Sequence, residues 1–478
     1  MELTGKDISF LRSKGISAEE AERQYQLLVK GTFYPNLCEG AEIGKGIFDL
    51  DSFKTNLSEL YDSQRKKLQI LRFIPASGAA TRMFSHLHDF LLNNSETELT
   101  DEFFNYRELF PFYYLIPEEI RNSKREFIGY LLSEKGLNYA SLPKALIPFH
   151  SEEQHLYTAF QSQLAESLGY AVGKDQKTII HFTIGREYLD TFRKQFSEYM
   201  EMEKLNPDLF AVSYSEQSSS TDTISLNENN EPVRNAEGEI MLRPGGHGSL
   251  IRNLNCITGD IIFIRNIDNV VSPKANYAYV DIHKKLGGLL LFLRDKLFEL
   301  QKKADEGLGF DTKEAEFLNK YFLYQGDISA KKLKKFLFRP LRVCGMVKNQ
   351  GEPGGGPFLI TEKDGSLSLQ IIESAQVNKA DAHQLKIFKS GSYFNPVDIV
   401  CSVMNYKGEK YDLRDFVNTD YSFLAEKKQF GKSIKVLEHP GLWNGSMHDW
   451  LTVFAEIPVS VFNPVKTVND LLRSAHQK

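Results

Sequence analysis

Strand-like segments alternate with helical ones through the middle of this 478-residue sequence, and this alternation restricts the fold more than any other feature. Apolar runs of strand length occupy residues 68–74, 177–182, 209–214 and 261–267, and helical patterns lie between or after them, at 154–168, 186–202 and 286–303. Such alternation predicts parallel strands with helical crossovers, and therefore an α/β fold with a mixed, mostly parallel sheet. Ligands bind beyond the carboxyl ends of such strands, so the residues after each strand are candidates for a site.

The flanking regions differ from this core. Residues 1–66 predict an N-terminal helical segment, with a capping box at Ser17 and Glu20 and a loop-like stretch at 33–47. Residues 67–400 predict the core, which carries a helical insert at 93–141 whose dense aromatic residues indicate a small packed subdomain. Residues 401–478 predict a β-rich C-terminal segment, with a strand at 458–462 and a final helix at 468–475.

Composition excludes several classes of protein. Hydrophobic residues make up 41% of the chain and charged residues 25%, which is ordinary for a globular protein, and the net charge of −5 without a dense basic run argues against nucleic acid as a partner. The four cysteines form no C-x-x-C pair, which argues against a zinc site or a disulfide framework. Without a signal-like N-terminus or an apolar run of membrane length, we expect a cytoplasmic protein with no membrane partner.

The turn after the strand at 68–74 is a candidate phosphate site. It is built from small residues and continues into a helical pattern, through Ser77, Gly78, Ala79, Ala80 and Thr81. Small side chains let a phosphate approach backbone N–H groups, and a helix N-terminus adds partial positive charge. Arg82 would add a bidentate donor.

Two lysines lie beside prolines. Lys144 follows Pro143 in L-P-K-A-L-I-P, and Lys466 follows Pro464 in N-P-V-K. Proline restricts the backbone and so places a neighbouring side chain stiffly, which suits a phosphate contact. Solvated loop lysines are an equally good explanation of the local sequence.

Asp268 stands directly after the strand at 261–267. A carboxylate at a strand end beside a phosphate site is where Mg²⁺ is held, with water and phosphate oxygens as its other ligands. A simple Asx turn at this position explains the residue equally well.

Other candidates lie in turns further along the chain. The amide of Gln217, after the strand at 209–214, can both donate and accept and so can read the edge of a pyrimidine. The glycines of R-P-G-G-H-G, including Gly245 and Gly246, would let a flat ligand lie on bare backbone beside His247. Glu373 ends a strand-like run and could accept hydrogen bonds from sugar hydroxyls, although an exposed carboxylate at a strand end is the commoner explanation.

Taken in order, these segments resemble the UTP-dependent sugar-1-phosphate uridylyltransferases, the UDP-glucose and UDP-N-acetylhexosamine pyrophosphorylase group. The resemblance runs discontinuously from about residue 70 to 473 and rests on G-H-G at 246–248, N-I-D-N at 266–269, E-S-A-Q-V at 373–377, K-I-F at 386–388 and F-N-P-V-K-T-V-N-D-L-L at 462–472. The whole chain also resembles DUF4301, a bacterial family of unknown function.

The resemblance implies a GT-A-like nucleotidyltransferase fold and a role for each matching residue. The loop from Ser77 to Arg82 would cradle the triphosphate, Lys144 would correspond to the lysine of a P-K element, and Lys466 would contact phosphates at the reacting centre. Asp268 would hold Mg²⁺. The nucleotide contacts would be completed by Gln217, Gly245, Gly246 and His247, and the sugar contacts would come from Glu373 and Ser392.

The sequence also departs from that group. The first loop has Ala79 and Ala80 where the group has more glycine, and the insert at 93–141 separates this loop from Lys144. A K-G-G segment after N-I-D-N is not evident, although Lys348 is one replacement. The segment after K-I-F, which includes Ser392, has the sequence K-S-G-S-Y. It therefore does not indicate which sugar would bind.

The implied activity is transfer of UMP from UTP to a sugar 1-phosphate, which gives a UDP-sugar and pyrophosphate. The alternative is a sugar-nucleotide-binding protein that does not catalyse the reaction. A Rossmann oxidoreductase is disfavoured, because A-S-G-A-A-T lacks the G-x-G-x-x-G spacing after the first strand.

Overall fold

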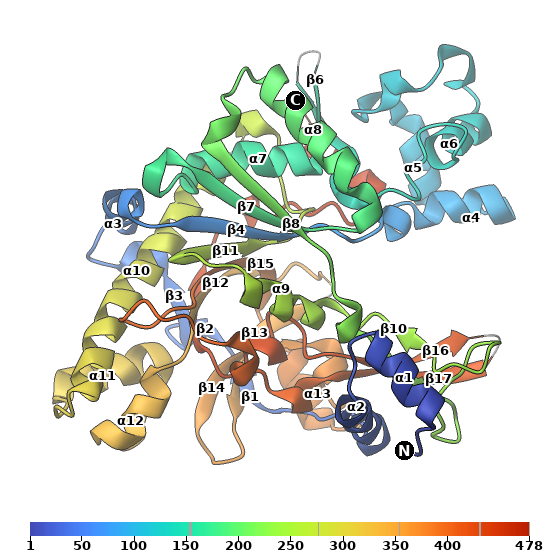
Figure 1. Cartoon of the computed structure of the whole chain (residues 1–478). Helices are drawn as coiled ribbons and strands as arrows, with labels where there is room; N and C mark the ends of the chain where they lie inside the picture. The colour runs from blue at the N-terminus through green and yellow to red at the C-terminus, as the bar shows by residue number, and fades with distance from the viewer. Residues whose placement is uncertain (153–154, 276, 353, 430–431, 478) are drawn as a thin grey trace. The chain divides into compact units, whose positions relative to one another are not determined.

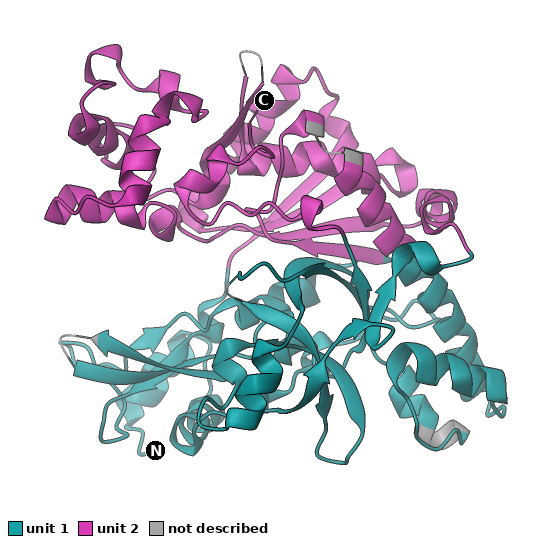
Figure 2. Cartoon of the chain, turned by 180° about the vertical axis from the view of Figure 1, so that it is seen from behind, with its two compact units in different colours: residues 1–54, 217–260, 289–457 teal, residues 55–216, 261–288, 458–478 magenta. Residues whose placement is uncertain are grey.

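The computed structural model describes residues 1–152, 155–275, 277–352, 354–429 and 432–477. The chain divides into two compact units, each built from discontinuous segments (Figure 2). Unit 1 comprises residues 1–54, 217–260 and 289–457, and unit 2 comprises residues 55–216, 261–288 and 458–478. Each of the contiguous segments expected from the sequence, 1–66, 67–400 and 401–478, therefore contributes to both units.

Unit 2 contains the α/β core that the alternating pattern predicted. Its strands lie in the order β11-β4-β7-β8 and all pair in parallel, with bounds β4 Ile70–Pro75, β7 Thr178–Thr183, β8 Phe210–Ser215 and β11 Ile261–Arg265 (Figure 1). The two central strands are buried almost throughout, which explains their continuous apolar runs. The expected α/β class is confirmed.

Five helices of unit 2 share one hydrophobic core with this sheet: α4 Ser85–Asn93, α5 Glu98–Asn105, α6 Lys124–Leu132, α7 Ala159–Tyr170 and α8 Leu189–Met202. Unit 2 also contains α3 Leu57–Gln64 and the start of α10 Tyr277–Asp305. Strand residues such as Ile74 and Phe182 pack with Leu87 of α4, Phe160 of α7 and Phe192 of α8. A hairpin of β5 Pro148–Glu152 and β6 His155–Thr158 precedes α7.

The insert at 93–141 is helical and packed, as its aromatic content predicted. The Phe103 ring lies 4.7 Å from the Phe110 ring, and Phe110 stacks on Phe112 at 5.4 Å. These side chains are buried in the same cluster as Met83 and Phe84, so the insert is part of the unit 2 core.

Unit 1 is richer in antiparallel pairing. One set of strands runs β2-β3-β18-β12-β15, parallel except for the β12–β15 pair, and two smaller sheets run β1-β13-β14 and β10-β9-β17-β16. The bounds are β1 Asn36–Gly40, β2 Glu42–Ile43, β3 Gly46–Asp49, β9 Thr223–Leu226, β10 Leu242–Arg243, β12 Leu341–Lys348, β13 Gly355–Thr361, β14 Leu367–Glu373, β15 Tyr393–Ser402, β16 Phe423–Gln429, β17 Lys432–Glu438 and β18 Leu451–Glu456.

The helices of unit 1 are mostly short. They are α1 Gly5–Ser13, α2 Ala18–Lys30, α9 Leu250–Cys256, the remainder of α10, α11 Thr312–Phe322, α12 Ala330–Leu337 and α13 Ala382–Lys389. Among the described residues, no helix combines the length and apolar content that crossing a membrane requires.

Several local predictions were wrong. The helix expected at 154–168 starts only at Ala159, because His155–Thr158 form strand β6. The supposed loop at 33–47 contains β1, β2 and the first residues of β3, because β1 pairs with β13, more than three hundred positions later. Residues 458–462 form a short 3₁₀ turn, Val459–Val461, instead of a strand. The final helix is a 3₁₀ helix, Val468–Leu472, instead of an α-helix over 468–475.

Candidate functional site

Strands β4 and β11 place two candidate loops at one edge of the unit 2 sheet. The strands are parallel neighbours with Ile70 opposite Ile261, so their carboxyl ends lie together. Strand β4 pairs on its other side with β7, which makes the gap between β4 and β11 the point where the strand order reverses. Ligands of open α/β sheets bind at such a switch point, and both the 77–82 loop and Asp268 follow these strand ends.

The 77–82 loop is open to solvent. Residues 77–79, 81 and 82 are exposed, whereas Ala80 is buried, and a Cβ added to Gly78 would meet nothing within 4 Å. One detail of the prediction was wrong: the loop enters a 3₁₀ turn, Ala80–Arg82, and α4 starts only at Ser85. The α-helix N-terminus is therefore displaced from the loop by a few residues.

Lys144 joins this loop to the Asp268 loop. Its backbone N–H donates to the carbonyl of Gly78 at 3.0 Å, and the N–H of Ala80 donates to the Leu142 carbonyl at 3.0 Å. Its Nζ donates to Asp268 Oδ2 and to the Val465 carbonyl, each at 2.9 Å. The insert therefore returns Lys144 to the first loop despite its length.

The segment that carries Lys466 runs beside the Asp268 loop. The N–H of Val465 donates to the Asp268 carbonyl at 3.0 Å, and the N–H of Asn463 donates to Asn269 Oδ1 at 2.9 Å. The backbone N–H of Lys466 donates to Asp470 Oδ2 at 2.8 Å. Further on, the N–H of Val468 donates to the carbonyl of Met83, the residue after Arg82.

A buried polar network supports the Asp268 loop from beneath. Gln163 Nε2 donates to the carbonyl of Asn266 at 3.0 Å, and its Oε1 accepts a hydrogen bond from Arg72. Glu166 accepts from Arg72 at 3.1 Å and from Arg265 at 2.7 Å. Because these charged groups are fully buried, the pairing is required to offset their desolvation, and it fixes α7 to β4 and β11.

A histidine near the C-terminus holds the Lys466 segment in place. His476 lies 3.1 Å from the Asn463 carbonyl through Nε2 and 3.0 Å from His150 Nε2 through Nδ1. His150 in turn contacts Ser162 on α7 at 2.9 Å. Burial lowers the pKa of both imidazoles, to about 4 for His476, so both are neutral near pH 7.

The residues around Asp268 fit only one manner of binding Mg²⁺. Among the described residues, no group of three or more His, Cys, Asp and Glu side chains is placed to hold a metal ion. An all-protein cage is therefore absent from this part of the chain. Nucleotide enzymes hold Mg²⁺ through one or two carboxylates with phosphate and water oxygens, and the single carboxylate of Asp268 fits that arrangement.

A second cluster, in unit 1, surrounds Glu373. Its Oε1 accepts from Trp443 Nε1 at 3.2 Å and from Asn444 Nδ2 at 3.1 Å, and lies 3.9 Å from His247 Nε2. The His247 ring stacks on Trp443 with centroids 4.2 Å apart. Glu373 is thus held by neighbours and is not a free carboxylate at a strand end.

The tautomer of His247 follows from its backbone partner. The N–H of Leu442 donates to His247 Nδ1 at 3.1 Å, so this nitrogen must be the acceptor and the proton resides on Nε2. Burial lowers the pKa of His247, which keeps the ring neutral at pH 7. The neutral ring presents its Nε2–H on the side where Glu373 lies.

The structure gives the glycines around His247 a packing role. A Cβ on Gly245 would lie 2.4 Å from the Thr221 carbonyl, and one on Gly248 would lie 2.1 Å from the Pro440 carbonyl. Gly246 has a φ of 74°, which favours glycine. Close approach to the 438–440 segment therefore explains these glycines without a ligand.

Gln217 belongs to the same part of unit 1. It begins the turn that leads to Thr221, beside Gly245. Its Nε2 is buried and has no hydrogen-bond partner within the described residues. A buried amide donor without a partner costs free energy, so a ligand carbonyl there would relieve that cost.

Ser392 lies elsewhere in unit 1. Its Oγ donates to Glu42 Oε1 at 3.2 Å, and together with Lys348 and Tyr393 it lines a pocket of about 590 Å³. The structure therefore brings Ser392 together with Lys348 and Glu42, and its contact with a sugar stays a prediction.

Sequence reasoning missed several residues of these two clusters. Trp443 and Asn444 bond to the candidate residue Glu373 from about seventy positions away. Gln163 and His476 bond to the backbone carbonyls of Asn266 and Asn463, beside the candidates Asp268 and Lys466. The sequence does contain one signal, since tryptophan occurs only twice in this chain and Trp443 is one of the two.

The fold and site define a mixed α/β protein in which a lysine–carboxylate pair lies at the carboxyl ends of two parallel strands. The chain belongs to the family described as Domain of unknown function (DUF4301), whose profile matches residues 4–477. No curated protein matches the sequence.

Solved structures align with most of the chain at low identity. A UDP-glucose phosphorylase from Trypanosoma brucei aligns at 14% identity and a TM-score of 0.49, covering 98% of this chain and 80% of that one. UDP-glucose pyrophosphorylase from Leishmania major aligns at 13% and 0.45, covering 98% and 79%. A protein described as UDP-N-acetylglucosamine pyrophosphorylase from Entamoeba histolytica aligns at 12% and 0.45, covering 88% and 82%.

Proposed function

We propose that this protein is a UTP:sugar-1-phosphate uridylyltransferase, which transfers UMP from UTP to a sugar 1-phosphate and releases pyrophosphate. One observation carries the proposal. Lys144 bonds to the first loop through its backbone N–H and to Asp268 and Val465 through its Nζ, so that one residue connects its own segment with three others. These are the segments in which the sequence resembles the uridylyltransferases.

The chemistry needs positioning and charge neutralisation more than proton transfer. A phosphate oxygen of the sugar 1-phosphate attacks the α-phosphorus of UTP in line, and pyrophosphate leaves with the bonding electron pair. The attacking oxygen is already anionic at neutral pH, so no general base is required. Catalysis then comes from alignment and from cations around the phosphates.

Residues of unit 2 would carry these roles. Backbone N–H groups of the exposed residues of the 77–82 loop and the Arg82 guanidinium would bind the triphosphate. Lys144 and Lys466 would neutralise charge that builds up on the transferring and leaving phosphates. Asp268 would hold Mg²⁺, which supplies further neutralisation of the phosphate oxygens.

For the base and the sugar, the sequence resemblance assigns the contacts to residues that belong to unit 1. The unpaired amide of Gln217 supports a contact with the uracil edge, next to the backbone of Gly245 and Gly246 and beside His247. Glu373, held by Trp443 and Asn444, would accept hydrogen bonds from sugar hydroxyls.

The test is release of pyrophosphate from UTP with a panel of sugar 1-phosphates, with and without Mg²⁺. We expect release that requires both substrates and stops when Mg²⁺ is chelated. If no sugar 1-phosphate supports release although UTP or a UDP-sugar binds, the protein is a non-catalytic sugar-nucleotide-binding protein. If pyrophosphate release were equally fast with ATP, CTP and GTP, the proposed recognition of the uracil base would be contradicted.

A further inference from the structure

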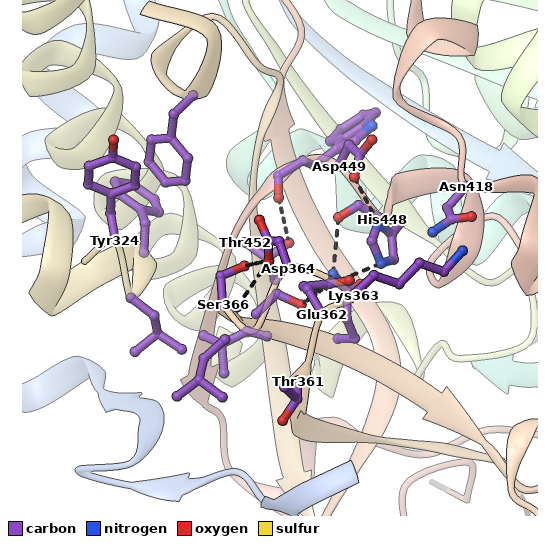
Figure 3. Close-up of a pocket in the computed structure, with 18 of the residues that line it drawn as sticks. Tyr324, Thr361, Glu362, Lys363, Asp364, Ser366, Asn418, His448, Asp449 and Thr452 are labelled. Carbon is purple, nitrogen blue, oxygen red and sulfur yellow. Dashed lines mark hydrogen bonds and ion pairs between the residues drawn. The ribbon is translucent and has the colours of Figure 1, made fainter. Parts of the chain in front are cut away.

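Unit 1 contains a large pocket that the proposed reaction does not use. It has a volume of about 1080 Å³, slightly above the roughly 300–1,000 Å³ usual for small-molecule sites. The turn between β13 and β14, the region from the end of α11 to α12, and the segment that leads into β18 all contribute to its lining (Figure 3). His247, Glu373 and Trp443 are not among the described residues that line it, so this pocket is separate from the Glu373 cluster.

Two buried polar atoms in its wall have no hydrogen-bond partner within the described residues. They are the acceptor Gln370 Oε1 and the donor Trp450 Nε1, on side chains that are 2% and 4% exposed. The amide nitrogen of Gln370 is occupied by the His448 carbonyl at 3.0 Å, which leaves its oxygen as the unpaired atom. A ligand that both donates and accepts hydrogen bonds would satisfy this donor and this acceptor together.

The charges of the wall are close to balance. Its basic side chains Lys335, Arg339 and Lys363 are matched by the acidic Glu362, Asp364 and Asp449. Lys363 is also paired with Asp420 at 2.6 Å, and Asp364 is bonded to the Ser366 hydroxyl at 2.6 Å. Because the charges of the wall nearly cancel, the wall does not attract a highly charged ligand more strongly than a neutral one.

His448 contributes to this balance. Its Nδ1 lies 2.8 Å from Asp449 and its Nε2 lies 3.2 Å from Glu362, and Figure 3 shows these side chains pointing toward one another. The imidazolium is thus enclosed by two carboxylates of the same wall. These groups are already occupied by one another and are poor partners for a separate ion.

Aromatic rings complete the lining. Tyr324, Phe336 and Tyr421 all line the pocket, and the rings of Tyr324 and Phe336 lie 4.4 Å apart. Aromatic faces pack against the apolar C–H faces of pyranose rings, while hydroxyl groups both donate and accept. We propose that this pocket binds a neutral sugar, a mono- or disaccharide, whose hydroxyls pair with Gln370 and Trp450.

The two tryptophans of the chain, Trp443 and Trp450, allow a direct test. In Trp443→Phe, Trp450 is the only tryptophan, so its emission reports on the pocket. We expect a saturable change on titration with glucose, mannose, N-acetylglucosamine, maltose or sucrose. Adding Tyr324→Ala should weaken binding at least about tenfold, the cost of losing a stacking contact of about 1.4 kcal/mol. Tyr106→Ala, at an exposed tyrosine of unit 2, is the matched control and should leave the titration unchanged.

Other results would overturn the proposal. These are the absence of a saturable change with every sugar, an unchanged titration in Tyr324→Ala, or a response to inorganic phosphate and sugar phosphates without one to neutral sugars. If Trp443→Phe does not fold, saturation-transfer NMR of the sugars with the wild-type chain and with Tyr324→Ala gives the same decision. No nucleotide enters these experiments, so their outcome is independent of uridylyl transfer.

Discussion

The ammonium group of Lys144 bonds to two other segments of unit 2. Its bonds to Asp268 Oδ2 and to the Val465 carbonyl, both 2.9 Å, show that it is held in one position before any ligand arrives. A cation fixed in this way suits transition-state stabilisation, because little reorganisation is needed when phosphate charge develops.

We therefore predict that Lys144→Met lowers kcat for pyrophosphate release on the order of a hundredfold or more, since it removes a preorganised charged contact. Steady-state kinetics with UTP and the best sugar 1-phosphate measure the effect. Lys135→Met, at an exposed lysine of the insert, is the control and should keep wild-type kinetics. A loss of only about twofold in Lys144→Met would show that this lysine serves the fold alone.

The protonation of His448 should make the free energy of unfolding depend on pH. Burial alone would lower its pKa, but its bonds to Asp449 and Glu362 raise the pKa to about 8. A raised histidine pKa contributes stability that is fully present below the unfolded value near 6.5 and is lost as pH rises through 8. The expected loss in the free energy of unfolding is about 2 kcal/mol, from a shift of roughly 1.5 pKa units.

Urea unfolding between pH 6 and 9 measures this loss, with His448→Gln as the comparison. The variant should be less stable at pH 6 and should show a flatter profile up to pH 9. An equally steep decline in the variant would mean that another group is responsible.

At the scale of residues, sequence reasoning succeeded where a local signal marked the site. Proline next to Lys144, small residues at 77–80 and a carboxylate after a strand pointed to groups that the structure brings together. It failed for Trp443 and Gln163, because their importance arises from contacts with residues dozens or more positions away. No local sequence pattern around Trp443 or Gln163 predicts these contacts.

At the scale of elements, two glycines allow a comparison of packing: Gly248 in the G-H-G turn and Gly78 in the first loop. A Cβ at Gly248 would lie 2.1 Å from the Pro440 carbonyl, whereas one at Gly78 would meet nothing within 4 Å. We predict that Gly248→Ala lowers the free energy of unfolding by about 1–3 kcal/mol through overpacking, and that Gly78→Ala leaves stability nearly unchanged.

Thermal unfolding of the two variants side by side measures the difference. If Gly248→Ala melted at the wild-type temperature, the packing explanation of this turn would have to be abandoned. Loss of UTP binding in a stable Gly78→Ala would support close approach of a phosphate to the first loop.

The C-terminal segment depends on a buried histidine contact. His476 bonds to the Asn463 carbonyl, three residues before Lys466, and is neutral with a pKa of about 4. A lowered histidine pKa means that the unfolded chain takes up the proton first, so stability falls as pH drops below about 6.5.

We predict that His476→Ala lowers stability at pH 7 by about 1–3 kcal/mol, the cost of leaving its buried partners unpaired. It should also raise KM for UTP, because the Lys466 segment loses its anchor, and it should flatten the decline in stability between pH 6.5 and 4. An unchanged acid profile in the variant would show that His150 or another group controls it.

The elements themselves were predicted unevenly. Strands β4, β7 and β11 follow from apolar runs because they are buried in the sheet, where burial leaves a continuous signal. Strand β8 was also predicted, although Phe210 is its only buried residue. Strand β1, by contrast, has one buried residue and exists because β13 pairs with it. Its composition alone indicated a loop.

At the scale of the whole molecule, the chain crosses between its units repeatedly, at 54–55, 216–217, 260–261, 288–289 and 457–458. No shift in composition marks these points, and the helix α10 continues through one of them. Because the sequence does not mark the crossing points, the sequence alone predicts three contiguous segments, 1–66, 67–400 and 401–478. The predicted phosphate residues nevertheless all belong to unit 2, while Gly245, Gly246, His247, Glu373 and Ser392 belong to unit 1.

The central claim is that the Lys144–Asp268 centre of unit 2 binds the phosphates of a nucleoside triphosphate. Isothermal titration of UTP, with Mg²⁺ present, into the wild type, Lys144→Met, Asp268→Asn and the control Lys135→Met tests it most directly. Charged hydrogen bonds are worth about 1.5–3 kcal/mol, so affinity should fall about tenfold to a hundredfold in the first two variants and stay unchanged in the control. Wild-type affinity for UTP in folded Lys144→Met and Asp268→Asn would contradict the claim.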